Sequence, residues 1–543
     1  MVNYTDGMTL EEQIGQLLMV GFWGSTPSQE IIDLIQRYHV GNILLFSRNI
    51  RDTRQVLELT QSLQTIAKEA GQRYPLLIAI DQENGIVQRL GEAATIFPGN
   101  MALGAIGSEE IAYQVAQATG HELKALGINM NLAPVVDVNN NPANPVVGVR
   151  SFGEDPQQVA RLGGAMVKGY HAAGVLSCLK HFPGHGDTAV DSHLALPTIP
   201  YTLERLETLE LVPFRGGIEA GAESVMIAHV SFPALTQHDM FPATLSSDIV
   251  QGLLREQLGF NGLILSDCLE MKAISETFGT ERAAVKALQA GIDLVLVSHH
   301  YKRQQGSIEA IRVAVQTHEL SSQAVQLAAE HMLRLKANYL SWKEIATSAT
   351  LPACIGCEAH LHLQDQVYEL STTLVRNEDA LLPLHLDKGE RIVVLSPRRN
   401  SISMVEDRYY ADDALTDIIG QYHTNVKTLS IASGAVEIAC RNLLQTTSES
   451  DIFIIATVNA HLDERQAEIV RYLVSSGRRI IVIAVRNPYD LQAFPQLRTY
   501  LVTYEYTRPA LVAAVRVLFG ERQALGHLPV GIPGLNHLTS EGP

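Results

Sequence analysis

The segment from Lys180 to His193 concentrates residue types that can bind polar groups and transfer protons. It reads KHFPGHGDTAVDSH and follows the apolar run GVLSCL, so we expect it directly after a buried strand. Barrel and open α/β enzymes carry their catalytic groups on loops at this position. The segment is therefore predicted to line an active site.

Asp191 and His193 are the candidate proton-transfer pair in this loop. They are separated by one residue, and in an extended chain two such side chains point to the same side. A carboxylate beside an imidazole fixes the tautomer of the ring and stabilises its protonated form. Such a histidine can act first as a general acid and then as a general base. The alternative is a surface pair without a chemical role.

His181, His185 and Asp187 in the same loop raise the alternative of a metal site. Their spacing is not the helical pair of histidines found in HExxH sites. Gly184 and Gly186 flank His185 and favour a tight, mobile turn instead. We therefore expect no metal ion in this loop.

A second chemical candidate is Asp267, in the segment GLILSDCLEM. It follows an apolar run, so its backbone is expected at the end of a strand. A carboxylate there could act as a nucleophile, a general base or a metal ligand. The alternative is that Asp267 only caps the helix that follows.

Further charged residues follow other apolar runs and could hydrogen-bond the hydroxyl groups of a sugar. These are Asp81, Arg89, Arg150, Lys180 and His181. For the two arginines the competing role is a salt bridge inside the scaffold, which for Arg150 could involve Asp137.

The elements that must position these residues form a repeating pattern in the first part of the chain. Eight near-continuous apolar runs alternate with longer amphipathic stretches, which predicts a parallel sheet in an α/β fold, specifically a (β/α)8 TIM-type barrel. Helices are expected from Ser28 to Tyr38, from Thr53 onwards, and from Asp155 to Ala173 with Gly174 as the stop signal. The eight runs are IGQLLMVGF, VGNILLF, PLLIAID, INMNLAPVVDV, GVLSCLKH, ESVMIAHV, GLILSD and IDLVLVSHH.

A second organisation begins after about Leu351. The runs RIVVLSP, DIFIIATV, RIIVIAVRNP and TYLVTYEY alternate with helical stretches and predict a smaller α/β sandwich. We place the catalytic barrel at residues 1–345, a helical linker at 346–374 and the C-terminal sandwich at 375–543. Cys354 and Cys357 have CxxC spacing in the linker, and we interpret them as ordinary linker residues rather than a zinc or redox site.

Composition narrows the class of partner. The net charge is −17, from 58 acidic and 41 basic residues, which disfavours nucleic acid and anionic membrane surfaces. No apolar run is long enough to span a membrane, and the N-terminus has no signal-peptide pattern. The five cysteines are mostly scattered, which predicts a reducing, cytoplasmic location.

Four segments together resemble the family 3 glycoside hydrolases, in the β-N-acetylglucosaminidase (NagZ-like) branch. They are DQENGIVQRL, NPVVGVRSFGEDP, KHFPGHGDTAVDSHLALP and LILSDCLEM, in this order and spacing. The segments LVRNEDALLPL, RNPYDL and VLFGERQALGHLPVGIPG resemble the second domain of the two-domain members. The resemblance therefore covers both predicted domains.

The resemblance implies hydrolysis with retention of anomeric configuration through a covalent glycosyl-Asp267 intermediate. It implies His193 as the acid/base, with Asp191 as its partner. The terminal N-acetylglucosamine would be held by Asp81, Arg89, Arg150, Lys180 and His181. It implies no metal and no organic cofactor. The substrate would be an oligosaccharide with terminal N-acetylglucosamine, such as a peptidoglycan or chitin fragment.

The chain departs from the common family pattern at Asn84, where many relatives have a second glycine, and at Cys268, where many have another aspartate. Alternative functions are a β-glucosidase or β-xylosidase of the same superfamily, which take the acid/base from a glutamate elsewhere. A phosphorylase is a further alternative, because a histidine acid/base does not repel an anionic acceptor. A non-catalytic sugar-binding protein is the alternative of a different class. The sequence does not indicate an oligomeric state.

Overall fold

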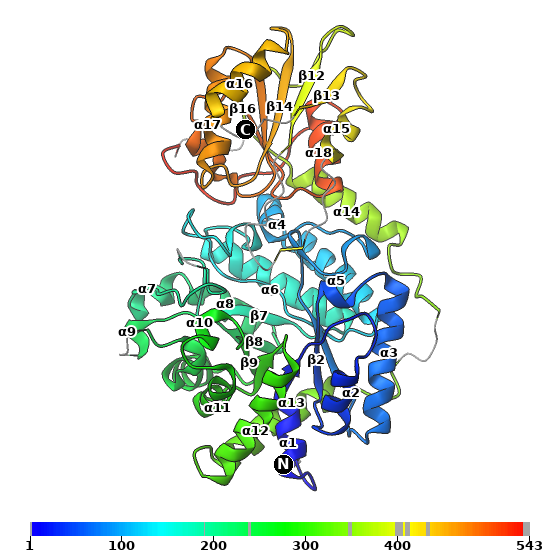
Figure 1. Ribbon diagram of the computed structural model, residues 1–543, viewed down its shortest axis with the longest axis vertical. Helices are drawn as coiled ribbons and strands as arrows, with labels where there is room; N and C mark the ends of the chain where they lie inside the picture. Colours follow the sequence, from blue (N-terminus) through cyan, green and yellow to red (C-terminus); the bar gives the residue numbers. More distant parts are fainter. Residues whose placement is uncertain are drawn as a thin grey trace.

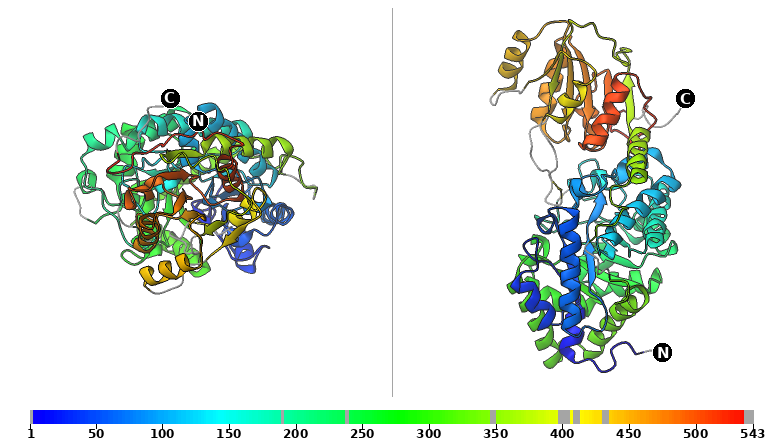
Figure 2. Two further views of the ribbon diagram at one scale, coloured as in Figure 1. Left: turned by 90° about the horizontal axis from the view of Figure 1, so that it is seen from above. Right: turned by 90° about the vertical axis from the view of Figure 1, so that its right-hand side faces the viewer.

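The chain folds into two parts stacked along its longest axis (Figures 1 and 2). The computed structural model describes residues 3–188, 191–236, 240–345, 350–396, 406–407, 413–429 and 435–535. The larger part is N-terminal, and the smaller, C-terminal part covers one end of it.

The larger part is built around an eight-stranded parallel sheet, as predicted from the apolar runs. The strand order is β6-β3-β2-β1-β10-β9-β8-β7, and parallel bridges from Met130 to Leu176 and from Val135 to Lys180 join its two ends. The sheet therefore closes into a (β/α)8-type barrel. Its strands are β1 (Leu18–Val20), β2 (Asn42–Leu45), β3 (Leu77–Ile80), β6 (Met130–Asn131), β7 (Cys178–Phe182), β8 (Ser224–Ile227), β9 (Leu263–Cys268) and β10 (Leu294–Val297).

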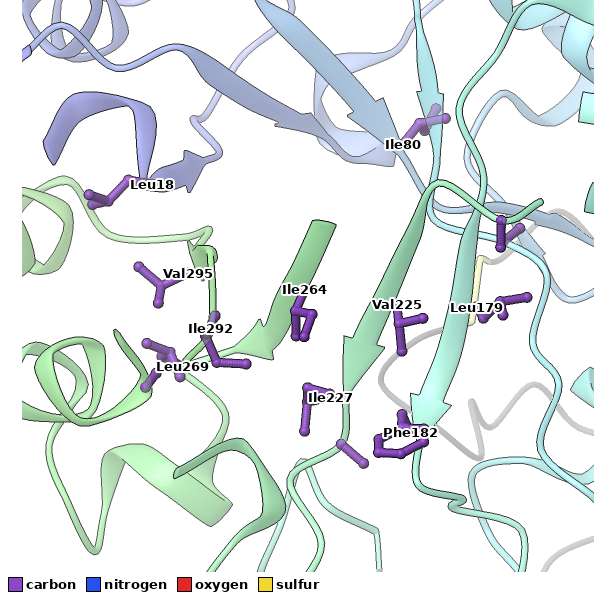
Figure 3. Close-up of a cluster of buried hydrophobic side chains, with 14 of the residues drawn as sticks. Leu18, Ile80, Leu179, Phe182, Val225, Ile227, Ile264, Leu269, Ile292 and Val295 are labelled. Atoms are coloured by element: carbon purple, nitrogen blue, oxygen red, sulfur yellow. The ribbon is translucent and has the colours of Figure 1, made fainter. Parts of the chain in front are cut away.

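Alternation of side chains along the strands produces two apolar layers. Leu18, Val225 and Ile264 belong to a buried cluster that the strands share with the surrounding helices (Figure 3). Their neighbours Met226 and Leu265 belong to a separate cluster that also contains Met332. The strands are thus buried on both sides, which is why they appear in the sequence as continuous apolar runs.

The helices around the barrel begin and end largely where the sequence predicts. Ser28 caps the second helix, and Asp155 caps the helix that ends at Gly174, whose φ of 73° suits glycine. The cap predicted at Thr53 is wrong. Asp52 is the capping residue, because its carboxylate accepts the Gln55 N–H at 2.9 Å, and Thr53 is the first helical residue.

No helix in the described ranges combines the length and the apolar character needed to cross a bilayer. The helices of the larger part are α1 (Leu10–Gln16), α2 (Gln29–Gln36), α3 (Thr53–Glu69), α4 (Asn100–Ile106), α5 (Glu109–Ala125), α6 (Pro156–Ala173), α7 (Leu203–Thr208), α8 (Leu211–Glu219), α9 (Pro233–Thr236), α10 (Lys272–Ser275), α11 (Thr280–Ala290), α12 (Tyr301–Gln316) and α13 (Ser322–Tyr339).

The smaller part is a six-stranded sheet in the order β11-β16-β15-β14-β12-β13, parallel except for β11, with helices on both faces. Residues alternate between two apolar clusters, one packed on α15 and α18 and the other on α16 and α17. The strands are β11 (Thr373–Asn377), β12 (Ile392–Leu395), β13 (Val426–Thr428), β14 (Ile452–Thr457), β15 (Arg479–Ala484) and β16 (Thr499–Val502). The helices are α14 (Glu358–Ser371), α15 (Ala414–Ile419), α16 (Val436–Gln445), α17 (Glu464–Ser475) and α18 (Arg508–Leu518).

The segment around Cys354 and Cys357 attaches the linker to the barrel. Glu122 of α5 accepts the Gly356 N–H at 3.0 Å and pairs with His360 at 2.7 Å. Both cysteines are free, and the described residues contain no group of three or more His, Cys, Asp or Glu arranged to hold a metal ion. We keep 1–345, 346–374 and 375–543 as the proposed domain bounds.

The two parts meet through apolar packing and hydrogen bonds. The sandwich cluster containing Tyr489 and Tyr504 also includes Ile86, Met101 and Val149 of the barrel part. Beside it, the buried Glu505 accepts the Gly99 N–H at 3.1 Å and the Tyr368 hydroxyl at 3.1 Å. Burial raises the pKa of Glu505 to about 7, against these hydrogen bonds, which act to lower it.

We expect the Glu505→Gln variant to be more stable than the wild type above neutral pH. A carboxyl whose folded-state pKa is raised contributes stability below its unfolded pKa, and this contribution is lost as pH rises through about 7. The loss amounts to roughly 3 kcal/mol at most, and glutamine avoids it while keeping polar atoms for both partners. Calorimetric scans should give the variant the higher Tm at about pH 8 and no advantage at about pH 4. Equal Tm differences at both pH values would contradict this role of Glu505.

Candidate active site

The carboxyl ends of the barrel strands open into a pocket of about 370 Å³ beneath the smaller part. Seven of the eight residues predicted for the site line this pocket, and the eighth, Asp191, is hydrogen-bonded to one of them. Segments far apart in the sequence thus converge, as expected for the mouth of a barrel. The seven are Asp81, Arg89, Arg150, Lys180, His181, His193 and Asp267.

Asp267 lies in β9, near its carboxyl end, and is partly exposed to the pocket. The helix that follows, α10, has Met271 at its cap position, so Asp267 is not a helix cap. Its Oδ1 accepts the Cys268 N–H at 2.7 Å. Burial acts to raise the pKa of Asp267, but three neighbouring histidines and this backbone N–H lower it to about 2. Asp267 is therefore an ionised carboxylate suited to nucleophilic attack.

Asp191 and His193 form the predicted pair, although the local chain is a turn rather than the extended segment that we expected. Asp191 Oδ1 accepts from the His193 backbone N–H at 2.8 Å and contacts ring Nδ1 at 2.7 Å. Burial acts to raise the pKa of Asp191, but its hydrogen bonds to His193 lower it overall. The anionic carboxylate favours a proton on Nδ1, which leaves Nε2 for proton transfer.

His181 is oriented by Asp137, a buried carboxylate. Asp137 Oδ2 lies 2.7 Å from His181 Nδ1, and its Oδ1 accepts the N–H groups of His181 and His185. Burial acts to raise the pKa of Asp137, but the two histidines lower it overall. The alternative in which Asp137 pairs with Arg150 is wrong, because Asp137 is committed to the histidine loop.

Six alternating charges, which we call the charge ladder, run along one wall of the site. Arg150 pairs with Glu83 in a bidentate contact with both distances at 2.7 Å. Lys180 lies 2.6 Å from Glu83 and 2.7 Å from Asp81. Arg89 lies 3.9 Å from Asp81 and 2.8 Å from Asp407. The order is therefore Arg150, Glu83, Lys180, Asp81, Arg89 and Asp407.

The charge ladder keeps its members ionised. Glu83 is buried, which acts to raise its pKa, but Arg150 and Lys180 lower it well below the ordinary value. Burial acts to lower the pKa of Lys180, and the two carboxylates beside it raise it overall. Arg89 and Arg150 thus combine the two roles proposed for them, since they line the pocket and also form buried ion pairs.

The smaller part contributes Glu406 and Asp407 to the pocket, and sequence reasoning missed both. Asp407 accepts the Gln88 N–H at 2.9 Å and is also hydrogen-bonded by Ser47. Glu406 forms an ion pair with Arg486 at 2.6 Å, with both side chains almost fully buried. No local pattern marks these two residues, because they reach the barrel only through the contact between the two parts.

The turn from Pro183 to Gly186 is buried and tightly packed, so the mobility predicted for it is wrong. A Cβ on Gly186 would lie 1.7 Å from the Val138 carbonyl oxygen, and a Cβ on Gly184 would meet Glu210. Both ring nitrogens of His185 contact hydroxyls, Thr188 Oγ1 and Ser192 Oγ, at 2.9 Å. The glycines therefore permit close packing of the loop.

Two positions that depart from the common pattern have simple structural consequences. Asn84 has a φ of 70°, a left-handed conformation that asparagine tolerates better than most residues and that suits glycine. Cys268 is buried, and this burial is the main cause that raises its pKa to about 12. Its thiol therefore stays protonated beside Asp267.

Comparisons with known proteins cover both parts of the chain. Residues 9–335 match the glycosyl hydrolase family 3 N terminal domain, and residues 372–539 match the family 3 C-terminal domain. A curated relative, "Beta-hexosaminidase A" from Pseudoalteromonas piscicida, is 32% identical over 97% of both chains.

Two solved structures are also similar. A family 3 β-N-acetylglucosaminidase from a Paenibacillus species has a TM-score of 0.89 and 40% identity, covering 97% of this chain and 99% of that one. A fungal multi-domain family 3 β-N-acetylglucosaminidase has a TM-score of 0.92 and 41% identity. That match covers 98% of this chain, which spans 62% of the fungal chain. The chain belongs to glycosyl hydrolase family 3.

Proposed function

We propose that the protein is a retaining exo-β-N-acetylglucosaminidase that releases terminal β-linked N-acetylglucosamine. The names of the similar proteins support this activity. The observation that carries the proposal is the Asp191–His193 pair, which lies in the same pocket as the ionised Asp267. A nucleophile and a proton carrier on opposite sides of one bond are what retaining hydrolysis requires.

In the first step, Asp267 attacks the anomeric carbon while His193 protonates the leaving oxygen. The low pKa of Asp267 means that the attacking carboxylate needs no deprotonation at ordinary pH. The new bond joins the sugar to the Asp267 oxygen, and the bond to the leaving oxygen breaks. In the second step, His193 takes a proton from water, which displaces Asp267 and restores the configuration.

The charge ladder and His181 would hold the terminal sugar. Charged hydrogen-bonding groups suit the hydroxyls of a pyranose, and ion pairing keeps these groups in fixed positions. The ladder side chains are largely buried, so they offer hydrogen bonds at the inner part of the pocket. An inner site that closes around one ring supports release of single terminal sugars.

Glu406 is the alternative proton donor, since β-glucosidases of the superfamily take the acid/base from a glutamate elsewhere. Its buried ion pair with Arg486 favours the ionised carboxylate. An ionised carboxylate has no proton to donate. We therefore assign the acid/base role to His193.

One substrate panel tests the proposed activity. We expect faster hydrolysis of an aryl β-N-acetylglucosaminide than of the matching β-glucoside, with the β-anomer of the sugar released first by NMR. Faster turnover of the glucoside would favour the β-glucosidase. Phosphate-dependent formation of a sugar 1-phosphate would favour the phosphorylase, and binding without turnover would favour a non-catalytic protein.

We expect the Asp407→Asn variant to lower kcat/KM by about 10- to 100-fold, because it removes the charge that holds Arg89 in the ladder. Steady-state kinetics on the aryl N-acetylglucosaminide measure the loss. Ser47→Ala is the matched control, since it removes one hydrogen bond to the same carboxylate and leaves the ion pair intact. Equal effects of the two variants would argue against the charge of Asp407.

The cysteines support a further proposal on location. All five are free, as expected for a protein of the cytoplasm.

A further inference from the structure

Trp23 is an exposed aromatic residue at the rim of the pocket. It lies in the loop between β1 and α2, its side chain is 62% exposed, and it lines the same pocket as Asp267 and His193. A large apolar side chain in this position is unusual unless it serves binding, since exposed aromatic surface gains free energy when it is covered.

The Trp23 ring is held in place from below. The Arg48 guanidinium lies 4.7 Å from the centre of the Trp23 ring and 4.1 Å from that of Phe46. Arg48 donates to the Phe22 and Ser298 carbonyls at 2.9 and 2.7 Å. The indole N–H donates to the His299 carbonyl at 3.2 Å. An aromatic ring fixed in this way loses little conformational entropy on binding, which favours a preformed platform.

The pocket divides into an inner and an outer region. The inner region holds the charge ladder, whose pocket-lining side chains are at most 15% exposed. The outer region holds Trp23, with Phe46 and His299 behind it. If the terminal sugar occupies the inner region, the group on its leaving oxygen must lie toward the open rim.

We propose that Trp23 is the stacking platform for the second pyranose ring of the substrate, on the leaving-group side of the bond that is cleaved. The face of a pyranose carries C–H groups that pack on an aromatic ring, while its hydroxyls stay in water at the rim. This inference rests on the proposed function and names its substrate class as an oligosaccharide. Trp23 selects among leaving groups and takes no part in bond cleavage.

Two substrates separate this role from catalysis. One is the β-1,4-linked disaccharide of N-acetylglucosamine, and the other is N-acetyl-β-glucosaminyl fluoride, whose leaving group is too small to reach the rim. We expect the Trp23→Ala variant to lower kcat/KM for the disaccharide by about 10- to 50-fold, with a change of less than about 3-fold for the fluoride. Trp23→Phe should restore most of the disaccharide activity because it keeps a ring.

The second tryptophan supplies the matched control. The chain has two tryptophans, and Trp342 donates to the Arg73 carbonyl outside the pocket. Trp342→Ala should leave both substrates unaffected. In a Trp342→Phe, Asp267→Asn background Trp23 is the sole indole, so its fluorescence should change on titration with the disaccharide and much less with N-acetylglucosamine.

The outcomes distinguish the two proposals. Equal losses on the disaccharide and the fluoride in Trp23→Ala, or no loss on either, would overturn the platform while leaving the hydrolase assignment intact. Failure of the wild type to hydrolyse the fluoride and the disaccharide would overturn the proposed function itself. An indole signal that responds equally to the monosaccharide would place Trp23 against the terminal sugar and reject the platform.

Discussion

The Asp267→Asn variant is expected to hydrolyse an aryl N-acetylglucosaminide on the order of 10⁴-fold more slowly than the wild type. An amide in place of the carboxylate cannot form the glycosyl ester and cannot balance positive charge at the anomeric carbon. Stopped assays over hours, with purified protein and a matched thermal melt, would measure the residual rate.

Azide gives this prediction a chemical signature. In Asp267→Ala, azide can enter the space left by the carboxylate and attack from that side, which yields the α-glycosyl azide. Asp187→Asn is the matched control, because Asp187 belongs to the same histidine loop but does not line the pocket. Near-wild-type turnover by Asp267→Asn, or a β-configured azide product from Asp267→Ala, would remove Asp267 from the nucleophile role.

The His193→Ala variant is expected to lose activity according to the leaving group. On the N-acetylglucosamine disaccharide we expect a loss of about 10²- to 10⁴-fold, because an alkoxide leaves poorly without a proton donor. A dinitrophenyl leaving group needs no proton, so glycosylation should stay fast and the covalent intermediate should accumulate. Mass spectrometry would then find one N-acetylglucosaminyl group on Asp267.

Two further variants test the assignment of the proton carrier. Asp191→Asn should weaken the same step and move the alkaline limb of the kcat/KM profile to lower pH, since it removes the charge that favours the imidazolium. Glu406→Gln should show no dependence on the leaving group. If Glu406→Gln shows that dependence and His193→Ala does not, the proton donor is the glutamate of the smaller part.

The barrel was predictable because its strands are buried on both sides. Each of the eight apolar runs contains one barrel strand, even β6, which is only two residues long. The half-exposed edge strands β11 and β13 were missed, because they lack a continuous apolar run. The hairpin of β4 (Gln82–Asn84) and β5 (Val87–Gln88) was missed for a related reason, since it is short and largely polar.

The site residues within single motifs were placed together correctly, but their mutual contacts were not. Glu83 follows the same strand as Asp81, yet only the structure shows that it joins Arg150 to Lys180. Asp407 lies 318 residues beyond Arg89, and no sequence period links them. Trp23 was also missed, because an aromatic residue in a loop after a strand reads as part of the core.

The source of Asp407 has a consequence for the order of events during synthesis. The barrel is translated first, and its strands can pair before the smaller part exists. The sheet that presents Asp407 has its first strand, β11, paired with its last, β16, so it closes only after about Val502 has been made. The barrel therefore waits with Arg89 and the inner pocket unfinished, and the ribosome has nearly completed the chain before the enzyme becomes competent.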